Sequence, residues 1–262
     1  SYPNMKTFVI DTKLIRPILS FGGWVTICNI LTPILVYLDR FLIGALLTMA
    51  ALGYYSVSYD MLSRLGIFPR SLGIVIFPAF STLGSDKEKL KQFYSRSLKI
   101  LLITMGPIVL ALVIFAGDIL TLWLGSDWAS KTTFVFQVLA IGILINALSQ
   151  MPGNLLDGIG RPDLRAKIFL LCVLPYATLL WFLIVKFGIV GAALAWALRA
   201  ALELILFLGI TWKVIKLNAA LFIKNGLLRA VMLYGGLVIA TSLLVGIFAE
   251  TLVAQCFTTG IC

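Results

Sequence analysis

The chain has 262 residues, of which 61% are hydrophobic and only 12% are charged, and its mean hydropathy is +1.05. This composition excludes an ordinary soluble domain, in which about a quarter of the residues are charged. The chain contains no histidine, which excludes histidine-based metal sites, histidine general bases and Ser-His-Asp catalysis. We expect no metal, no cofactor and no enzyme activity.

Long apolar segments recur along the chain and predict membrane-spanning helices, since one span needs about 20 mostly apolar residues. In chain order the segments cover residues 18–42, 54–79, 100–116, 134–155, 168–185, 189–212 and 230–248. A closed β-barrel would instead show short alternating strands. The predicted fold is therefore all-α, a polytopic transmembrane bundle of about seven helices. We divide it into a six-helix bundle over residues 1–217 and an additional C-terminal helix and tail over residues 218–262.

A polar segment, residues 84–99, separates the second and third predicted spans. Ser85 is followed three residues later by Glu88, which is the pattern of a capping box, and Leu90 and Tyr94 then follow at helical spacing. We expect this segment to form an amphipathic helix on the membrane surface.

The basic residues are distributed unevenly between the two sides of the predicted bundle. If the N-terminus is cytoplasmic, most of the 21 Lys and Arg residues fall in inner loops, and the outer loops hold only Lys131 and Lys186. This distribution obeys the positive-inside rule. We therefore expect a multi-pass protein of the cytoplasmic (inner) membrane with a cytoplasmic N-terminus, whose positive charge faces the lipid bilayer surface and not a nucleic acid.

The few charges inside the predicted spans occur in pairs. The pairs are Asp39 with Arg40, Asp60 with Arg64, and Arg199 with Glu203. A charge in hydrocarbon costs several kcal/mol unless it is paired or hydrated, so such pairs indicate a polar cavity. An alternative is that each pair only satisfies itself and holds helices together. For the first pair a second alternative is that the side chains reach the outer interface by snorkelling.

Polar side chains also repeat on single helical faces. Asn29 shares a face with Arg40, and Asn146 shares a face with Gln150. Arginine suits phosphate or carboxylate, and amides supply the donors and acceptors that sugar hydroxyls need. We therefore predict a membrane transporter for an anionic, sugar-bearing substrate. The predicted substrate-binding residues are Arg40, Arg64, Arg199, Asn29, Asn146 and Gln150, and the predicted proton- or ion-coupling residues are Asp39, Asp60 and Glu203.

Three motifs occur together in the chain: LDRFLIG at residues 38–44, FPAFS at 77–81 and GRPD at 160–163. With their surroundings, from about Ser20 to Leu217, they resemble the oligosaccharide flippase family. These are the polysaccharide-biosynthesis and O-antigen transporters of the multidrug, oligosaccharidyl-lipid and polysaccharide exporter superfamily.

The resemblance implies a fold of two six-helix bundles that face each other across a central, cationic cavity. This chain would correspond to the second bundle plus one extra helix, and the missing N-terminal bundle of the same protein would be its partner. The implied activity is alternating-access transport of undecaprenyl-pyrophosphate-linked oligosaccharide across the cytoplasmic membrane, for cell-surface polysaccharide assembly.

Three alternatives remain open at this point. A drug or metabolite exporter of the same superfamily would have an acid-dominated cavity, against which the intramembrane arginines argue. A glycan polymerase or ligase would need catalytic groups in a large outer loop, where only Asp118 and Asp127 are available. A purely structural membrane subunit would be favoured if the polar faces were dry and fully self-paired.

Overall fold

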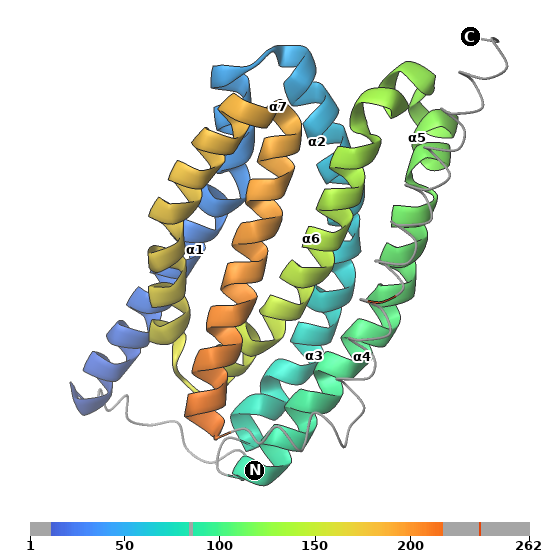
Figure 1. The fold of residues 1–262 in the computed structure, drawn as a ribbon. Coiled ribbons are helices and arrows are strands. Elements are labelled where there is room, and N and C mark those ends of the chain that lie inside the picture. The colour runs from blue at the N-terminus through green and yellow to red at the C-terminus, as the bar shows by residue number, and fades with distance from the viewer. Residues whose placement is uncertain (1–11, 84–85, 217–235, 237–262) are drawn as a thin grey trace, which may run out of the picture.

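The computed structural model of the chain describes residues 12–83 and 86–216, together with Gly236 (Figure 1). Within these ranges the regular structure is all helical. The elements are α1 (Thr12–Leu46), α2 (Met49–Ser63), the 3₁₀ turn η1 (Arg64–Gly66), α3 (Ile67–Leu83), α4 (Lys87–Ile114), α5 (Ala116–Leu124), α6 (Ser126–Gly158) and α7 (Pro162–Ile215). The predicted all-α bundle is confirmed. The predicted helix at 230–248 and the domain boundary after residue 217 lie outside the described residues.

Five segments of the described chain are long and apolar enough to cross a membrane: Leu19–Leu46, Met49–Leu83, Lys87–Ile114, Ser126–Gly158 and Pro162–Ile215. The last of these, α7, has 54 residues. At 1.5 Å per residue it would extend about 80 Å, far more than the hydrocarbon core of about 30 Å.

The excess length is explained by a break at Gly188, which divides α7 into two arms. Its backbone has φ 57° and ψ −135°, in the region that favours glycine, and the two arms lie antiparallel beside each other (Figure 1). With the arms counted separately, the described residues account for the six predicted spans up to residue 212.

The second predicted span is an interrupted crossing made of α2, η1 and α3. Pro69 lacks an N–H group and cannot donate to the carbonyl of Leu65, four residues earlier. The tighter 3₁₀ turn at this point also changes the angle between successive side chains. The polar face of α2 therefore cannot be extended into α3 by simple helical periodicity.

The amphipathic surface helix expected over residues 84–99 is not a separate element. Asp86 caps the start of α4, and its carboxylate accepts from the backbone N–H of Lys89 at 3.2 Å. A second hydrogen bond, from the Lys89 ammonium, lowers the pKa of Asp86. From there α4 continues unbroken into its apolar half, because its buried face, with Leu90 and Tyr94, packs against the bundle and not against the bilayer surface.

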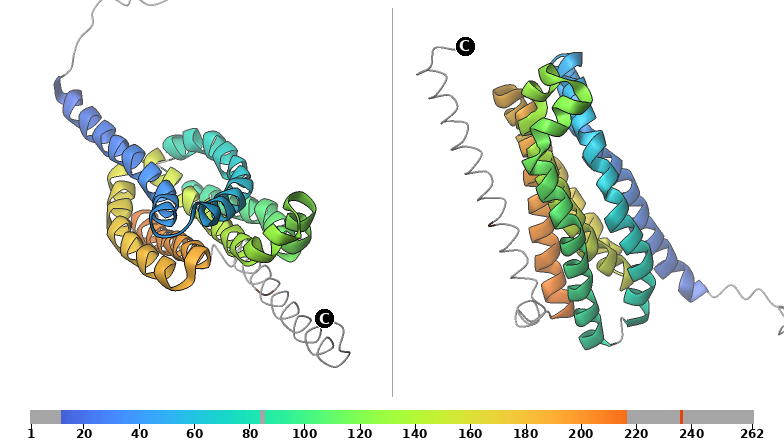
Figure 2. Two further views of the ribbon diagram at one scale, coloured as in Figure 1. Left: turned by 90° about the horizontal axis from the view of Figure 1, so that it is seen from above. Right: turned by 90° about the vertical axis from the view of Figure 1, so that its right-hand side faces the viewer.

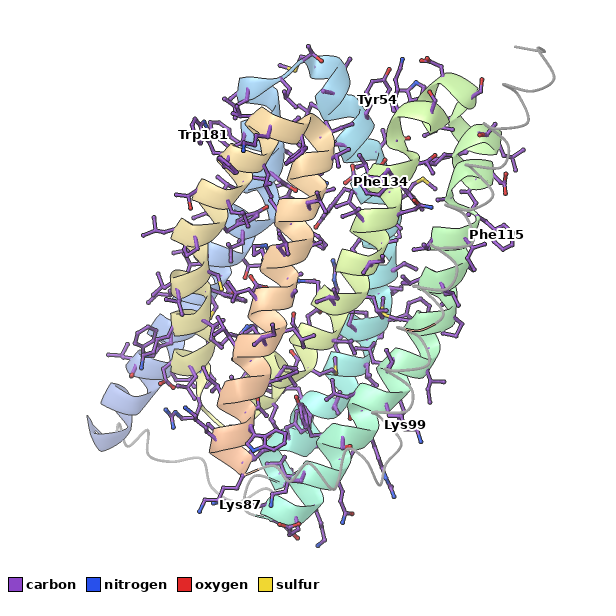
Figure 3. All side chains as sticks on the ribbon, in the orientation of Figure 1. Tyr54, Lys87, Lys99, Phe115, Phe134 and Trp181 are labelled. Carbon is purple, nitrogen blue, oxygen red and sulfur yellow. The ribbon has the colours of Figure 1, made fainter. Side chains whose placement is uncertain are left out.

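The up-and-down order of the helices collects the basic residues at one end of the bundle. The starts of α1 and α4, the α6–α7 turn and the end of α7 all lie at the lower end in Figure 1. Lys87 and Lys99 mark this end in Figure 3, and Tyr54 and Trp181 lie toward the other. We call the lower end the basic end. The N-terminal part of α1 leans away from the other helices there (Figure 2).

The outer surface of the bundle is strongly apolar along its length. Ile74, Val75 and Leu174 are 76%, 73% and 75% exposed. An apolar surface of this extent would be unfavourable in water, whereas contact with lipid chains exposes no apolar group to water. The fold is thus that of a multi-pass membrane protein.

Helix α6 is the central element, packing against α2, α3, α4, α5 and α7. Its close approach to α7 depends on Gly142, which is buried. A Cβ atom at Gly142 would lie 2.8 Å from Cζ3 of Trp196 and 3.2 Å from Cβ of Ala197. Small residues are common where membrane helices approach each other closely.

Replacing Gly142 with Leu is expected to lower the free energy of unfolding by about 1–3 kcal/mol, because α6 and α7 must separate to accept the side chain. Thermal denaturation in detergent measures the effect. Gly209→Ala in α7 is the control, since no atom lies within 4 Å of the added Cβ. It should leave stability unchanged or raise it slightly. An unchanged midpoint for Gly142→Leu would contradict the close packing.

Candidate functional site

A cavity of about 290 Å³ lies between α1, α2, α3, α6 and both arms of α7. It is lined by Thr32, Leu35, Val36, Tyr59, Arg70, Asn146, Ser149, Gln150, Gly153, Asn154, Arg165, Phe169, Arg199, Glu203 and Phe207. We call it the central cavity. A pocket that mixes apolar side chains with a few convergent polar groups is the usual form of a small-molecule site.

The ion pair between Arg199 and Glu203 is the most deeply buried charged part of the lining. The two side chains are 4% and 2% exposed, and Nη1 of the arginine donates to Oε1 of the glutamate. The predicted pairing is therefore confirmed. The guanidinium carbon also lies 5.2 Å from the ring centre of Tyr176 and 5.5 Å from that of Trp196. Its buried Nε has no hydrogen-bond partner among the described residues, so a donor remains available at the cavity.

Helix α6 contributes an amide-rich face to the central cavity. Nε2 of Gln150 donates to Oδ1 of Asn146 at 3.3 Å. Asn154 lies one turn further along, beside α3, where a Cβ at Gly73 would come within 2.6 Å of its Nδ2. Glycine at this position thus leaves room for the amide. The predicted residues Asn146 and Gln150 are brought together with Arg199 in one cavity.

Two further arginines, which were not predicted from the sequence as site residues, also line the cavity. Arg165 donates from Nη1 to Oδ2 of Asp157, and its guanidinium lies 5.4 Å from the ring centre of Phe169. Arg70 is exposed, and no Asp or Glu of the described chain forms an ion pair with it. Because the other two arginines are each paired with a carboxylate, Arg70 gives the cavity a net positive charge. The signal that could have found it is its lack of an acid partner within a predicted span.

A second cluster of charges lies on α1 and α2, next to the cavity. Nη2 of Arg40 and Oδ1 of Asp60 are 2.6 Å apart and join the two helices. The sequence predicted that Asp60 would pair with Arg64, and this pairing is wrong. Helix α2 ends at Ser63 and Arg64 begins the 3₁₀ turn, so the four-residue spacing does not place it over Asp60.

Asp39 is fully buried in this second cluster. Its Oδ1 accepts from the backbone N–H of Arg40 at 2.7 Å, and its Oδ2 accepts from the hydroxyl of Tyr55. Asp39 is therefore held by α2 as well as by α1. Snorkelling of this side chain to the interface is excluded by its burial.

Tyr59 connects the second cluster to the central cavity. Its ring centre lies 4.6 Å from the guanidinium carbon of Arg40, and on the cavity side it packs edge-on against Trp196 at 5.4 Å. The acidic and basic groups of the two sites are thus linked through two aromatic rings.

The remaining predicted residues lie outside the lining of the central cavity. Asn29 is exposed on the same face of α1 as Thr32 and Val36, which do line it. Arg64 is exposed on η1 and is not part of the lining. Within the described ranges, no group of three or more Cys, Asp and Glu side chains is placed to hold a metal ion.

The fold is similar to that of a solved multidrug resistance MATE family transporter of the MOP superfamily, in an outward-facing conformation. The TM-score is 0.64 at 19% sequence identity, over 76% of this chain and 45% of that protein. The likeness establishes the arrangement of the helices.

Among curated proteins, a putative O-antigen transporter of Shigella flexneri is 30% identical over 194 residues, which are 74% of this chain and 46% of the relative. The probable low-salt glycan biosynthesis flippase Agl15 of Haloferax volcanii is 24% identical, over 74% of this chain and 41% of the relative. The lipopolysaccharide biosynthesis protein WzxC of Escherichia coli K12 is 27% identical, over 58% and 31%. The chain thus spans less than half the length of each of these relatives.

The family described as "Polysaccharide biosynthesis protein" matches residues 3–133, half of the chain. This match agrees with the helix arrangement and with the named relatives. The chain belongs to the polysaccharide biosynthesis protein family of membrane proteins.

Proposed function

We propose that the chain forms half of a flippase that moves an anionic, lipid-linked oligosaccharide across the cytoplasmic membrane by alternating access, for cell-surface polysaccharide assembly. The observation that carries the proposal is the central cavity, which combines arginines with amides inside a bundle of membrane-spanning helices. Relatives named as an O-antigen transporter and as flippases support this reading.

In this proposal the arginines contact the negative charges of the substrate and the amides contact its sugar hydroxyls. Arg199, Asn146 and Gln150 keep the roles predicted from the sequence, and we add Arg70 and Asn154 to them. Arg40 would act at the adjoining cluster. Substrate contacts at Asn29 and Arg64 stay predictions.

We further propose that Asp39, Asp60 and Glu203 couple transport to the movement of a proton or cation. Two of them are buried beside an arginine or tyrosine, and all three lie next to residues proposed to bind substrate. Acidic groups at such depth in a membrane are costly and are usually retained for function.

The working transporter would include a second bundle that faces the central cavity, since the solved transporter that the fold resembles is about twice as long as the aligned part. We propose that this bundle is the N-terminal half of the same protein and that the substrate carrier is undecaprenyl pyrophosphate. The basic end would face the cytoplasm, which places the N-terminus of the chain there.

The second candidate is an exporter of drugs or metabolites, which the similarity to a multidrug transporter favours. Such proteins commonly handle cationic amphiphiles. Arg70, which has no carboxylate partner among the described residues, and the net positive charge of the central cavity argue for an anionic substrate instead. A polymerase or ligase is not supported by any relative named here, and we propose no catalytic residue.

A vesicle assay with the full-length transporter tests the proposal. Lipid-linked oligosaccharide is loaded into the inner leaflet, and an external glycosidase reports the fraction that has crossed. We expect an anionic glycan to become accessible in the presence of a proton or sodium gradient, and a cationic dye to remain in place. Transport of the dye but not of the glycan would favour the exporter. Transport of neither under any gradient would contradict both assignments.

A further inference from the structure

A second cavity, of about 370 Å³, lies at the basic end of the bundle between α1 and the α6–α7 turn. Its lining includes Phe21 and Trp24 from α1 and Arg161, Asp163 and Lys167 from the turn and the start of α7. It shares no lining residue with the central cavity. We call it the inner-end cavity.

Two cations in the inner-end cavity share one carboxylate. Nε of Arg161 lies 3.0 Å from Oδ1 of Asp163, and Nζ of Lys167 lies 3.3 Å from Oδ2 of the same residue. The two basic side chains remain 50% and 59% exposed, whereas the aspartate is only 20% exposed. The group therefore has one net positive charge and presents its N–H donors outward, which suits a ligand that carries a single negative charge.

The backbone adds to this positive character. Helix α7 begins at Pro162, immediately beside the two cations, and among the described residues no side chain caps its first turn. The N-terminus of a helix carries a partial positive charge that favours phosphate. The partial positive charge of this helix end therefore adds to the charge of the two side chains.

The apolar surroundings of the inner-end cavity indicate what kind of phosphate compound fits it. Nζ of Lys167 lies 5.6 Å from the ring centre of Trp24, and tryptophan is a residue enriched at membrane–water interfaces. One to two turns further along α7, Leu170, Leu171 and Leu174 are 49%, 62% and 75% exposed. A phosphate at the cavity would therefore lie directly beside a surface suited to hydrocarbon chains.

We propose that the inner-end cavity binds the phosphodiester headgroup of an anionic phospholipid from the adjacent leaflet. The lipid chains would lie along the exposed face of α7. Basic pockets between membrane helices on the cytoplasmic side are suited to such headgroups. The inference requires that the chain spans a membrane, and it does not depend on the transported substrate.

Quenching of tryptophan fluorescence by brominated lipids tests the proposal in the full-length protein reconstituted in phosphatidylcholine vesicles. The chain has 6 tryptophans, so the Trp24 signal is taken as the difference between the wild type and Trp24→Phe. Brominated phosphatidylglycerol should quench Trp24 with about fivefold higher affinity than brominated phosphatidylcholine. Arg161→Gln/Lys167→Gln should bring this ratio close to one.

Lys87→Gln/Lys89→Gln is the matched control, since it removes two positive charges from the start of α4 at the same end of the bundle and outside the cavity. This control variant should keep the preference for phosphatidylglycerol. If the double variant at the cavity does not fold, Lys167→Gln alone, which changes an exposed side chain, should still reduce the preference at least twofold.

Equal quenching by the two lipids in the wild type would overturn the proposal. A preference for phosphatidylglycerol that persists in the cavity variants would also overturn the proposal. Displacement of phosphatidylglycerol by millimolar inorganic phosphate or pyrophosphate would assign the site to a soluble phosphate and contradict the lipid. A preference that persists in both salts supports the phospholipid.

Discussion

Replacing Arg199 with Met is expected to lower the free energy of unfolding by about 3–5 kcal/mol, because it leaves the carboxylate of Glu203 buried without its partner. Denaturant titration in mixed micelles measures the loss. The double variant Arg199→Met/Glu203→Met should recover most of the stability, since replacing a whole buried pair with apolar side chains of similar size is often neutral.

The same double variant separates a structural role from a functional one. If the pair contributes to substrate binding or coupling, the recovered protein should translocate lipid-linked oligosaccharide at least tenfold more slowly than the wild type in the vesicle assay. Normal translocation by a stable double variant would show that the pair serves only to hold the two turns of α7 in place.

Replacing Arg70 with Gln is expected to reduce the initial rate of translocation at least tenfold. A hydrogen bond to a charged group contributes about 1.5–3 kcal/mol, and about 1.4 kcal/mol corresponds to a factor of ten. Because the side chain is exposed and has no carboxylate partner in the described chain, stability should change by less than about 0.5 kcal/mol. Transport and thermal denaturation are measured on the same preparation.

Arg64→Gln is the matched control, because this arginine is also exposed and lies on the same interrupted span, but outside the lining of the central cavity. The cavity geometry predicts that Arg64→Gln changes the initial rate of translocation less than twofold. A large loss with Arg64→Gln and none with Arg70→Gln would instead favour the assignment made from helical faces, and would show that the central cavity is not the substrate surface.

Most of the fold could be predicted from the sequence because the length of an apolar run is a direct physical requirement of the bilayer. The turn at Gly188, for example, lies between two predicted spans, 168–185 and 189–212. The start of α4 was predicted incorrectly. Its periodicity correctly indicates an amphipathic helix, but periodicity cannot tell whether the apolar face meets lipid or other helices.

The site was predictable only where its contacts are local. The pair Arg199 and Glu203 follows from helical spacing within one arm of α7. The contact of Arg40 with Asp60 depends on how α1 packs against α2, which a single sequence does not encode in any short pattern. Arg70 was missed for a related reason, since η1 and Pro69 end the regular rotation on which the face assignment relied.

The turn at Gly188 brings the two arms of α7 into close contact. A Cβ atom at Gly191 would collide with the carbonyl oxygen of Leu183, so the chain reverses direction with backbone against backbone. The two arms are therefore held close together at the turn, which restricts how far they can separate there. In the proposed transport cycle, changes in the shape of the central cavity would then come from its other lining helices, α1, α2, α3 and α6, or from the second bundle that we propose to face it.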